Sequence, residues 1–156
     1  MIDIFGDECE MKQVIRFGIE VPGYYATRSG RIFSTKTNRF LAEIMDTSTG
    51  YYKTSLSFPV GLFSDHNYFQ MKGKKTSYNS PIDTHRLIAE TFIPIDKYPP
   101  IPIEDWNNTP ESAKQFIRDA AVVDHILPDK SNNSVENLRW VTPKQNNPFR
   151  KEQELK

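Results

Sequence analysis

The chain has 156 residues, which is enough for one folded domain or two small modules. A hydrophobic content of 37% and an aromatic content of 12% exclude a disordered chain, and no apolar run approaches the roughly 20 residues of a membrane-spanning helix. The formal net charge is zero, so overall charge alone does not indicate a nucleic-acid partner.

The N-terminal segment is acidic, with four carboxylates and no basic residue among its first ten positions. It lacks a secretory pattern, so we expect a cytoplasmic protein, and its charge argues against contact with phosphate. Cys9 is the single cysteine of the chain, which excludes an intramolecular disulfide and a zinc site built from several cysteines.

Residues 21–80 have the composition of β-strands separated by turns. The alternation in residues 51–58 predicts a half-buried strand, and residues 63–70 and 76–80 are candidates for further strands. Tight turns are indicated where glycine, proline and asparagine cluster, at residues 22–23, 28–31 and 36–39. The segment therefore predicts an antiparallel meander rich in aromatic residues.

Basic residues are concentrated in two segments of the chain. Residues 24–75 hold eight basic against three acidic side chains, and residues 139–156 hold five against two. A groove that follows DNA phosphates needs such local excess, although ordinary solvated charges on a β scaffold give the same count. The candidate DNA-binding residues share this charge and location: Arg28, Arg31, Lys36, Arg39, Lys53, Lys74, Lys75, Arg139 and Lys144.

An amphipathic helix is predicted over residues 83–95. Asp83 or Thr84 is suited to cap its start, and Pro94 is expected to end it. His85 lies close to its N-terminus, where it could contact phosphate or support a site, but a structural role is more common for an isolated histidine.

Residues 97–120 form a segment with net negative charge. Its first part, residues 97–106, is Pro-rich and expected to be extended, and a helix over residues 110–120 is predicted with Thr109 as its N-cap. We expect this segment to pack on the core or face a protein partner, away from DNA, with Trp106 as a packing anchor.

The most informative stretch is residues 121–147. An apolar run at residues 121–123 predicts a strand, a polar loop follows, and a second apolar run at residues 138–141 precedes the helix-start signal Thr142-Pro143. The order is therefore strand, loop, strand and helix.

Two side chains with complementary chemistry follow the first of these strands. Asp124 and His125 are neighbours on an extended segment, so their side chains should point to opposite sides. A carboxylate together with the amide oxygen of Asn146 suits a hard cation such as Mg²⁺, with water completing the coordination. A histidine, whose ordinary pKa is about 6.5, is well suited to act as a general base beside that ion. Metal and base together are typical of phosphodiester hydrolysis.

Residues 124–147, DHILPDKSNNSVENLRWVTPKQNN, resemble the HNH nuclease motif, or ββα-metal fold, in the version found in phage and intron-encoded homing endonucleases. The resemblance implies that His125 is the general base and that Asn137 is the catalytic asparagine that holds the loop and orients the base. It implies Asp124 and Asn146 as ligands of Mg²⁺ or Mn²⁺, and no structural zinc is expected. Pro148 should kink or stop the last helix, which bears on the placement of Asn146.

The expected fold class is α+β, with an N-terminal antiparallel β module, connecting helices and a C-terminal ββα-metal motif. The β module, residues 1–80, is similar to the one that precedes the nuclease motif in phage homing endonucleases, and residues 81–156 form the nuclease part with an insertion at 97–120. The implied function is metal-dependent cleavage of double-stranded DNA by a monomer or homodimer in a phage-infected or host bacterial cell. One alternative is a DNA-binding regulator that uses the same fold without cutting. Another, based on the zero net charge and the acidic N-terminus, is a structural or inhibitory phage-type protein with an acidic face.

Overall fold

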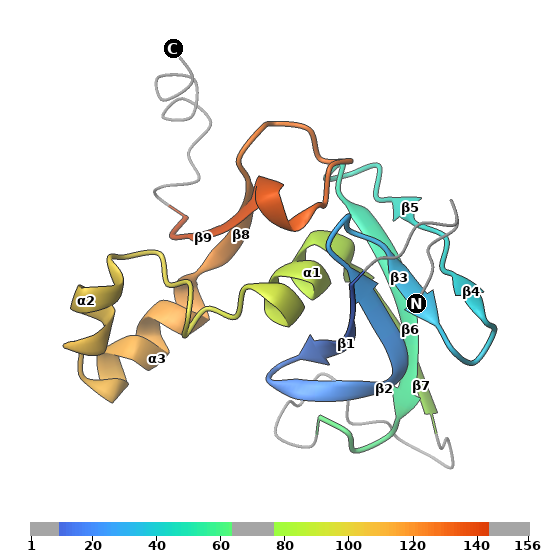
Figure 1. The fold of residues 1–156 in the computed structure, drawn as a ribbon, viewed down its shortest axis with the longest axis horizontal. Coiled ribbons are helices and arrows are strands. Elements are labelled where there is room, and N and C mark those ends of the chain that lie inside the picture. Colours follow the sequence, from blue (N-terminus) through green and yellow to red (C-terminus); the bar gives the residue numbers. More distant parts are fainter. Residues whose placement is uncertain (1–9, 64–76, 144–156) are drawn as a thin grey trace.

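The computed structural model describes residues 10–63 and 77–143, which fold into three antiparallel sheets and three α-helices (Figure 1). The sheets have the strand orders β1-β2-β3-β4, β5-β6-β7 and β8-β9. The strands are β1 Met11–Arg16, β2 Ile19–Thr27, β3 Ile32–Ser34, β4 Arg39–Phe40, β5 Ile44–Met45, β6 Tyr52–Pro59, β7 Ser77–Asp83, β8 Val122–His125 and β9 Leu138–Val141. The helices are α1 Thr84–Phe92, α2 Ile103–Asn107 and α3 Glu111–Ala120, with a 3₁₀ turn at Val135–Asn137. The α+β class expected from the sequence is confirmed.

The β1–β2 hairpin turns at Phe17-Gly18, where both residues have positive φ angles, of 54° and 75°. Two consecutive left-handed residues are the signature of a type I′ turn, whose twist suits a two-residue hairpin. The hairpin directs Val14 and Val21 inward, and both are fully buried.

Strand β6 shows the alternation that its sequence predicts. Thr54, Leu56 and Phe58 are buried on one face, and the residues between them are more exposed. Strand β7 pairs with β6 along its whole length. The strands predicted near residues 51–58 and 76–80 are therefore confirmed, whereas most of the candidate strand at 63–70 lies outside the described residues.

Helix α1 begins directly after β7 and is shorter than predicted. Asp83 occupies the N-cap position but makes no side-chain capping hydrogen bond. The helix ends at Phe92 because Pro94 disfavours a helical conformation at Ile93, whose φ and ψ are −127° and 59°. The predicted range ran three positions too far, to residue 95, whereas the prediction that Pro94 ends the helix is confirmed.

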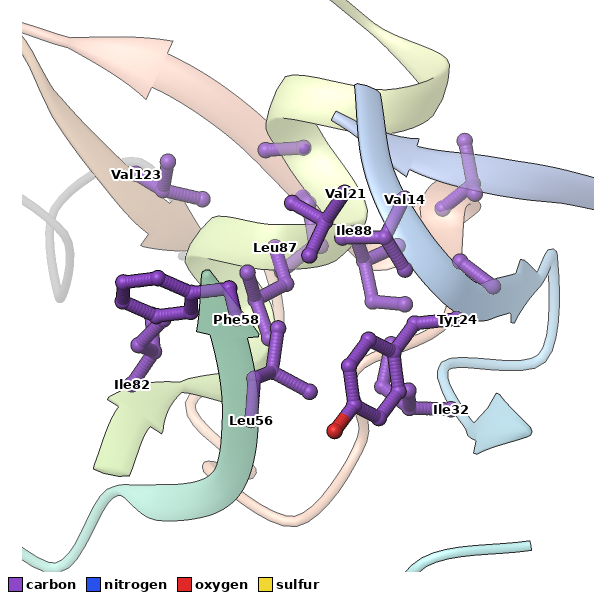
Figure 2. Close-up of a cluster of buried hydrophobic side chains, with 14 of the residues drawn as sticks. Val14, Val21, Tyr24, Ile32, Leu56, Phe58, Ile82, Leu87, Ile88 and Val123 are labelled. Carbon is purple, nitrogen blue, oxygen red and sulfur yellow. The ribbon is translucent and has the colours of Figure 1, made fainter. Parts of the chain in front are cut away.

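Helix α1 lies at the centre of the hydrophobic core (Figure 2). Fully burying such apolar side chains contributes about 1.5–3 kcal/mol each, so this cluster is a main source of stability. Its members come from both predicted parts of the chain, including Val14, Val21, Leu56, Leu87, Ile88 and Val123. The division at residue 80 remains a prediction, and the two parts share one core.

Helices α2 and α3 extend from the body on the side away from the β1–β4 sheet (Figure 1). The expectation that residues 97–106 are extended was wrong at their C-terminal end, because α2 begins at Ile103. Trp106 is 2% exposed, with Lys114 and Arg118 over its ring, so its role as a packing anchor is confirmed.

The start of α3 differs from the prediction by one residue. Thr109 donates its hydroxyl to the Asp105 carbonyl oxygen (2.6 Å), so this side chain is used by the preceding helix. Pro110 is consequently the N-cap of α3, and it has no side-chain group to offer. No helix in the described ranges is both long and apolar enough to cross a bilayer.

Candidate active site

The β8–β9 hairpin places the two central residues of the predicted site. Its register pairs Asp124 with Arg139 and His125 with Leu138. Because successive side chains of a strand point to opposite faces, Asp124 meets Arg139 on one face while His125 contacts His85 on the other. The prediction of opposite orientation is confirmed.

The imidazole of His125 is buried, at 4% exposure, and hydrogen-bonded. Its Nε2 lies 2.7 Å from the Oδ1 of Asn133. An amide oxygen can only accept a hydrogen bond, so Nε2 carries the hydrogen in this pair and Nδ1 keeps its lone pair. The geometry therefore leaves one defined nitrogen of His125 able to accept a proton.

The Asn137 side chain is hydrogen-bonded to the backbone of the loop. Its Oδ1 accepts from the Leu127 N–H (2.8 Å), and its Nδ2 donates to the Asn132 carbonyl oxygen (2.9 Å). The Ile126 N–H also donates to the Asn137 carbonyl oxygen (2.8 Å). These bonds close the loop between β8 and β9, and they hold the segment that carries Asn133.

Asp124 is buried, at 2% exposure, and its Oδ2 accepts a hydrogen bond from the Nε of Arg139 (3.0 Å). A buried carboxylate needs positive charge or hydrogen bonds, and Arg139 supplies both. Within residues 10–63 and 77–143 there is no cluster of three histidine, cysteine or acidic side chains that could hold a metal ion. One carboxylate with an amide oxygen and water fits Mg²⁺, which commonly keeps several waters, and does not fit a site built for zinc.

Two aromatic side chains surround His125. The Tyr51 ring is stacked on it, with centroids 5.8 Å apart and planes at 16°, and the His85 ring lies 4.9 Å away at 53°. Burial, followed by the charges of His125 and Arg86, lowers the pKa of His85 to about 3, so this ring is neutral at neutral pH. Burial and the negative charges of Asp124 and Asp83 raise the pKa of the Tyr51 phenol.

The turn between β2 and β3 fixes the loop from outside. The Val135 N–H donates to the Arg28 carbonyl oxygen (2.9 Å). Gly30 has a φ of 96°, and a Cβ there would lie 2.5 Å from the backbone of Asn133. Only glycine permits this approach, so the contact places a turn of the β module against the residue that bonds His125.

Most of the described candidates for DNA binding contact other groups of the protein. Lys36 donates to the Ser57 carbonyl oxygen (2.8 Å), and Lys53 lies 3.5 Å from Asp46. The remaining described members have these surroundings: Arg28 lies 3.6 Å from Glu136, Arg31 lies over the Phe40 ring, Arg139 bonds Asp124, and Arg39 is exposed on β4. Lys74, Lys75, Lys144 and the predicted ligand Asn146 lie outside the described residues, as does Pro148.

Sequence reasoning missed Asn133 and Tyr51. Asn133 belongs to the Asn132-Asn133 pair within the nuclease motif, so its position in the loop was a usable signal. Tyr51 carries no local signal, because only the tertiary fold brings the segment before β6 to His125. His85 was considered as a support for the site, and the structure places it in contact with His125.

Comparisons with known proteins agree on the family. A family profile described as HNH endonuclease matches residues 83–147. The chain is 32% identical over 123 residues to an uncharacterized HNH endonuclease of Acanthamoeba polyphaga mimivirus, covering 79% of this chain and 26% of that protein. The fold is similar to the solved structure titled "DNA binding and cleavage by the HNH homing endonuclease I-HmuI", with a TM-score of 0.56 and 24% identity. That match covers 93% of this chain and 59% of the other, so the chain spans less than two thirds of either protein. Residues 83–147 therefore match the HNH endonuclease family.

Proposed function

We propose that this protein is a metal-dependent endonuclease that hydrolyses phosphodiester bonds of double-stranded DNA, with His125 as its general base. The observation that carries the proposal is the placement of Asp124 and His125 on opposite faces of β8, both buried and both hydrogen-bonded. This arrangement assigns ion binding and proton transfer to separate groups, as phosphodiester hydrolysis requires.

Proton transfer is assigned to the Nδ1 of His125. Nε2 donates its hydrogen to the Asn133 Oδ1, so Nδ1 is the nitrogen that removes a proton from the attacking water. The water oxygen forms a bond to phosphorus as the bond from phosphorus to the 3′ oxygen breaks. The resemblance to HNH nucleases implies products with a 5′-phosphate and a 3′-hydroxyl.

Neutralisation of the phosphate charge is assigned to an ion bound on the opposite face of β8. HNH nucleases are generally metal-dependent, and Asp124 would hold Mg²⁺ or Mn²⁺ together with Asn146, the second ligand implied by the sequence. When bound, such an ion neutralises negative charge on the phosphate and on the leaving oxygen. Arg139 keeps the Asp124 carboxylate in place through its hydrogen bond and adds positive charge there.

The proposed substrate is duplex DNA, contacted through the basic side chains of the β module and β9. The solved structure with a similar fold is described as an HNH homing endonuclease that binds and cleaves DNA, which supports this proposal. One such site per chain cuts one strand, so a double-strand break needs a homodimer or two visits by a monomer. A phage-type homing enzyme acting in the cytoplasm of a bacterial cell remains part of the same proposal.

The test is relaxation of supercoiled plasmid with Mg²⁺, with Mn²⁺ and with EDTA. Wild-type protein should nick the plasmid with either ion and not with EDTA. His125→Ala should lose roughly 10²–10⁴-fold in rate, the usual contribution of a general base. His66→Ala is a change of the same kind at a histidine without an assigned role, and it should cut at the wild-type rate.

A gel shift with metal withheld separates the proposed enzyme from the non-catalytic alternative. If the protein is the proposed enzyme, His125→Ala should still bind the plasmid DNA with wild-type affinity. If the wild type binds DNA in this assay but cuts none of a library of random sequences, the protein is a DNA-binding regulator and the proposal is wrong.

A further inference from the structure

The imidazole of His125, the proposed base, contacts two other aromatic rings, and the three rings come from three separate parts of the fold. Tyr51 precedes β6, His85 lies in the first turn of α1, and His125 ends β8. The centroid distances are 4.7 Å between Tyr51 and His85, 4.9 Å between the two histidines and 5.8 Å between Tyr51 and His125. All three fall in the range of aromatic contacts, so each ring touches both of the others.

The hydrogen bond between His125 and Asn133 does not by itself fix the imidazole plane. It holds one atom of the ring, and the χ2 torsion of a histidine is a broad, soft rotation. The Tyr51 ring is stacked on the imidazole with only 16° between the planes. Rotation of His125 about χ2 would tilt the imidazole into the tyrosine, so the stacked ring restricts the motion that the hydrogen bond leaves free.

Tyr51 is itself held in place by contacts with other residues. The Nζ of Lys130 lies 4.5 Å from the centroid of the tyrosine ring and donates to the Thr49 carbonyl oxygen (2.6 Å). The Asp46 N–H donates to the Tyr51 carbonyl oxygen (2.8 Å), and the Gly50 N–H donates to the Asp46 carbonyl oxygen (2.7 Å). The turn before β6 therefore presents this ring from a closed backbone, and a cation attaches it to the nuclease loop.

His85 completes the enclosure from the side. Its ring is buried at 53° to the imidazole, and its Nδ1 has no hydrogen-bond partner in the described part of the chain. A buried polar nitrogen without a partner lowers stability, and an apolar residue would avoid that cost. His85 therefore adds a second ring contact to His125.

We propose that Tyr51 is a positioning residue for His125, whose stacked ring keeps the imidazole plane aligned for proton transfer at Nδ1. This inference rests on the proposed function, because it assigns to the β module a direct part in the chemistry of the nuclease hairpin. Proton uptake by His125 produces an imidazolium, and an aromatic face attracts such a cation. The ring of Tyr51 therefore supports both states of the base, and its hydroxyl has no assigned part.

The test compares Tyr51→Leu, which removes the ring, with Tyr51→Phe, which keeps it. Tyr52→Leu is the matched control, since it removes the neighbouring tyrosine of the same turn-to-strand segment. With Mg²⁺, Tyr51→Leu should lose roughly 10–100-fold in kcat, as expected for a misaligned catalytic group, with KM and metal-free DNA affinity unchanged. Tyr51→Phe should restore the wild-type rate.

A second readout is independent of cleavage. In ¹H–¹⁵N NMR spectra, wild-type His125 should show the tautomer with hydrogen on Nε2, with its ring protons shifted upfield by the Tyr51 ring. Tyr51→Leu should lose that ring-current shift and broaden the signals, and Tyr51→Phe should keep both. Thermal unfolding of each variant shows whether the chain is folded under the assay conditions.

The possible failures are distinct. If the wild type cleaves DNA and Tyr51→Leu cleaves at the same rate, the inference is wrong and the proposed function stands. An equal loss in Tyr51→Phe and Tyr51→Leu would assign the effect to the hydroxyl and also overturn the inference. If no protein cleaves DNA, the proposed function fails, and unchanged His125 signals in Tyr51→Leu would show that the ring does not hold the imidazole either.

Discussion

Two adjacent regions of the chain differ in which side chains they bury. The β8–β9 hairpin with its loop buries polar side chains, whereas the α2–α3 segment exposes a large apolar one. The hairpin and loop bury four polar residues, Asp124, His125, Asn133 and Asn137. Helix α3 buries no residue, and its Phe116 is 74% exposed. Buried polar groups are costly unless they are hydrogen-bonded, so the polar residues of the hairpin need a defined geometry. The side chains of α3 are mainly solvated and do not.

The comparison also separates two kinds of charge. In the α2–α3 segment, Arg118 lies 2.8 Å from Asp96 and 2.6 Å from Glu111, but both carboxylates are exposed and such pairs stabilise little. In the hairpin, Arg139 lies 3.0 Å from a fully buried Asp124. The first set is replaceable by water, and the second determines where a carboxylate stands in the proposed site.

The largest effect is expected for Asn137→Ala. The change removes the side chain of the buried Asn137, and the Leu127 N–H and the Asn132 carbonyl oxygen lose their partner, so the free energy of unfolding should fall by roughly 2–4 kcal/mol. Asn107→Ala, at an exposed asparagine of α2, should change it by less than about 0.5 kcal/mol. Urea denaturation of both variants measures the difference, and equal midpoints would show that the loop does not depend on Asn137.

Gly30→Ala tests the contact between the β module and the loop. The added Cβ would meet the Asn133 backbone at 2.5 Å, whereas a Cβ at Gly18 would have no atom within 4 Å. Both glycines have positive φ, so both alanine variants carry backbone strain, and overpacking adds about 1–3 kcal/mol at Gly30 alone. Plasmid nicking should fall in Gly30→Ala and persist in Gly18→Ala; equal rates would contradict a role for this contact in holding Asn133.

His85→Leu should flatten the acid dependence of stability. The folded-state pKa of His85 is about 3 against an ordinary value of 6.5, so the unfolded chain binds a proton first as pH falls. Wild-type stability should therefore decrease from about pH 6.5 toward pH 3, by up to about 1.4 kcal/mol per pH unit from this group. The variant lacks that contribution, and urea midpoints at several pH values measure it. A difference between the two proteins that is constant with pH would show that His85 is not held neutral.

The smallest effect is expected for Phe116→Ser. This side chain is already in solvent, so the free energy of unfolding should change by less than about 0.5 kcal/mol and the nicking rate should be unchanged. A loss of more than about 1 kcal/mol in a urea titration would mean that α3 packs its exposed face in solution, and it would weaken the contrast between the two regions.

The sequence predicted best where local patterns determine structure. The alternation before Pro59, the strand that ends in Asp124 and His125, and their opposite orientation all follow from period-two geometry. The resemblance to HNH nucleases agrees with the family profile that matches residues 83–147, and the backbone hydrogen bonds of Asn137 agree with the loop-holding role that it implied. The catalytic and metal-binding roles themselves remain predictions.

Sequence reasoning failed where a residue is used by a distant or unexpected partner. Thr109 has the composition of an N-cap, but its hydroxyl bonds a carbonyl of α2, a helix too short to show periodicity. Tyr51 and Gly30 meet the nuclease loop only because the shared core brings the β strands onto α1. No local pattern encodes such contacts. Asn133 was missed because only the closed loop brings it to His125.

The bond from Lys130 to Thr49 joins residues 81 positions apart in the chain. Contacts of such high sequence separation form slowly, because closing a long loop costs chain entropy. During translation, the proposed base cannot acquire its complete surroundings until synthesis has passed the loop after β8. A nascent or partly unfolded chain would therefore carry the residues of the proposed site without their folded arrangement, so the proposed cleavage would be confined to the finished fold.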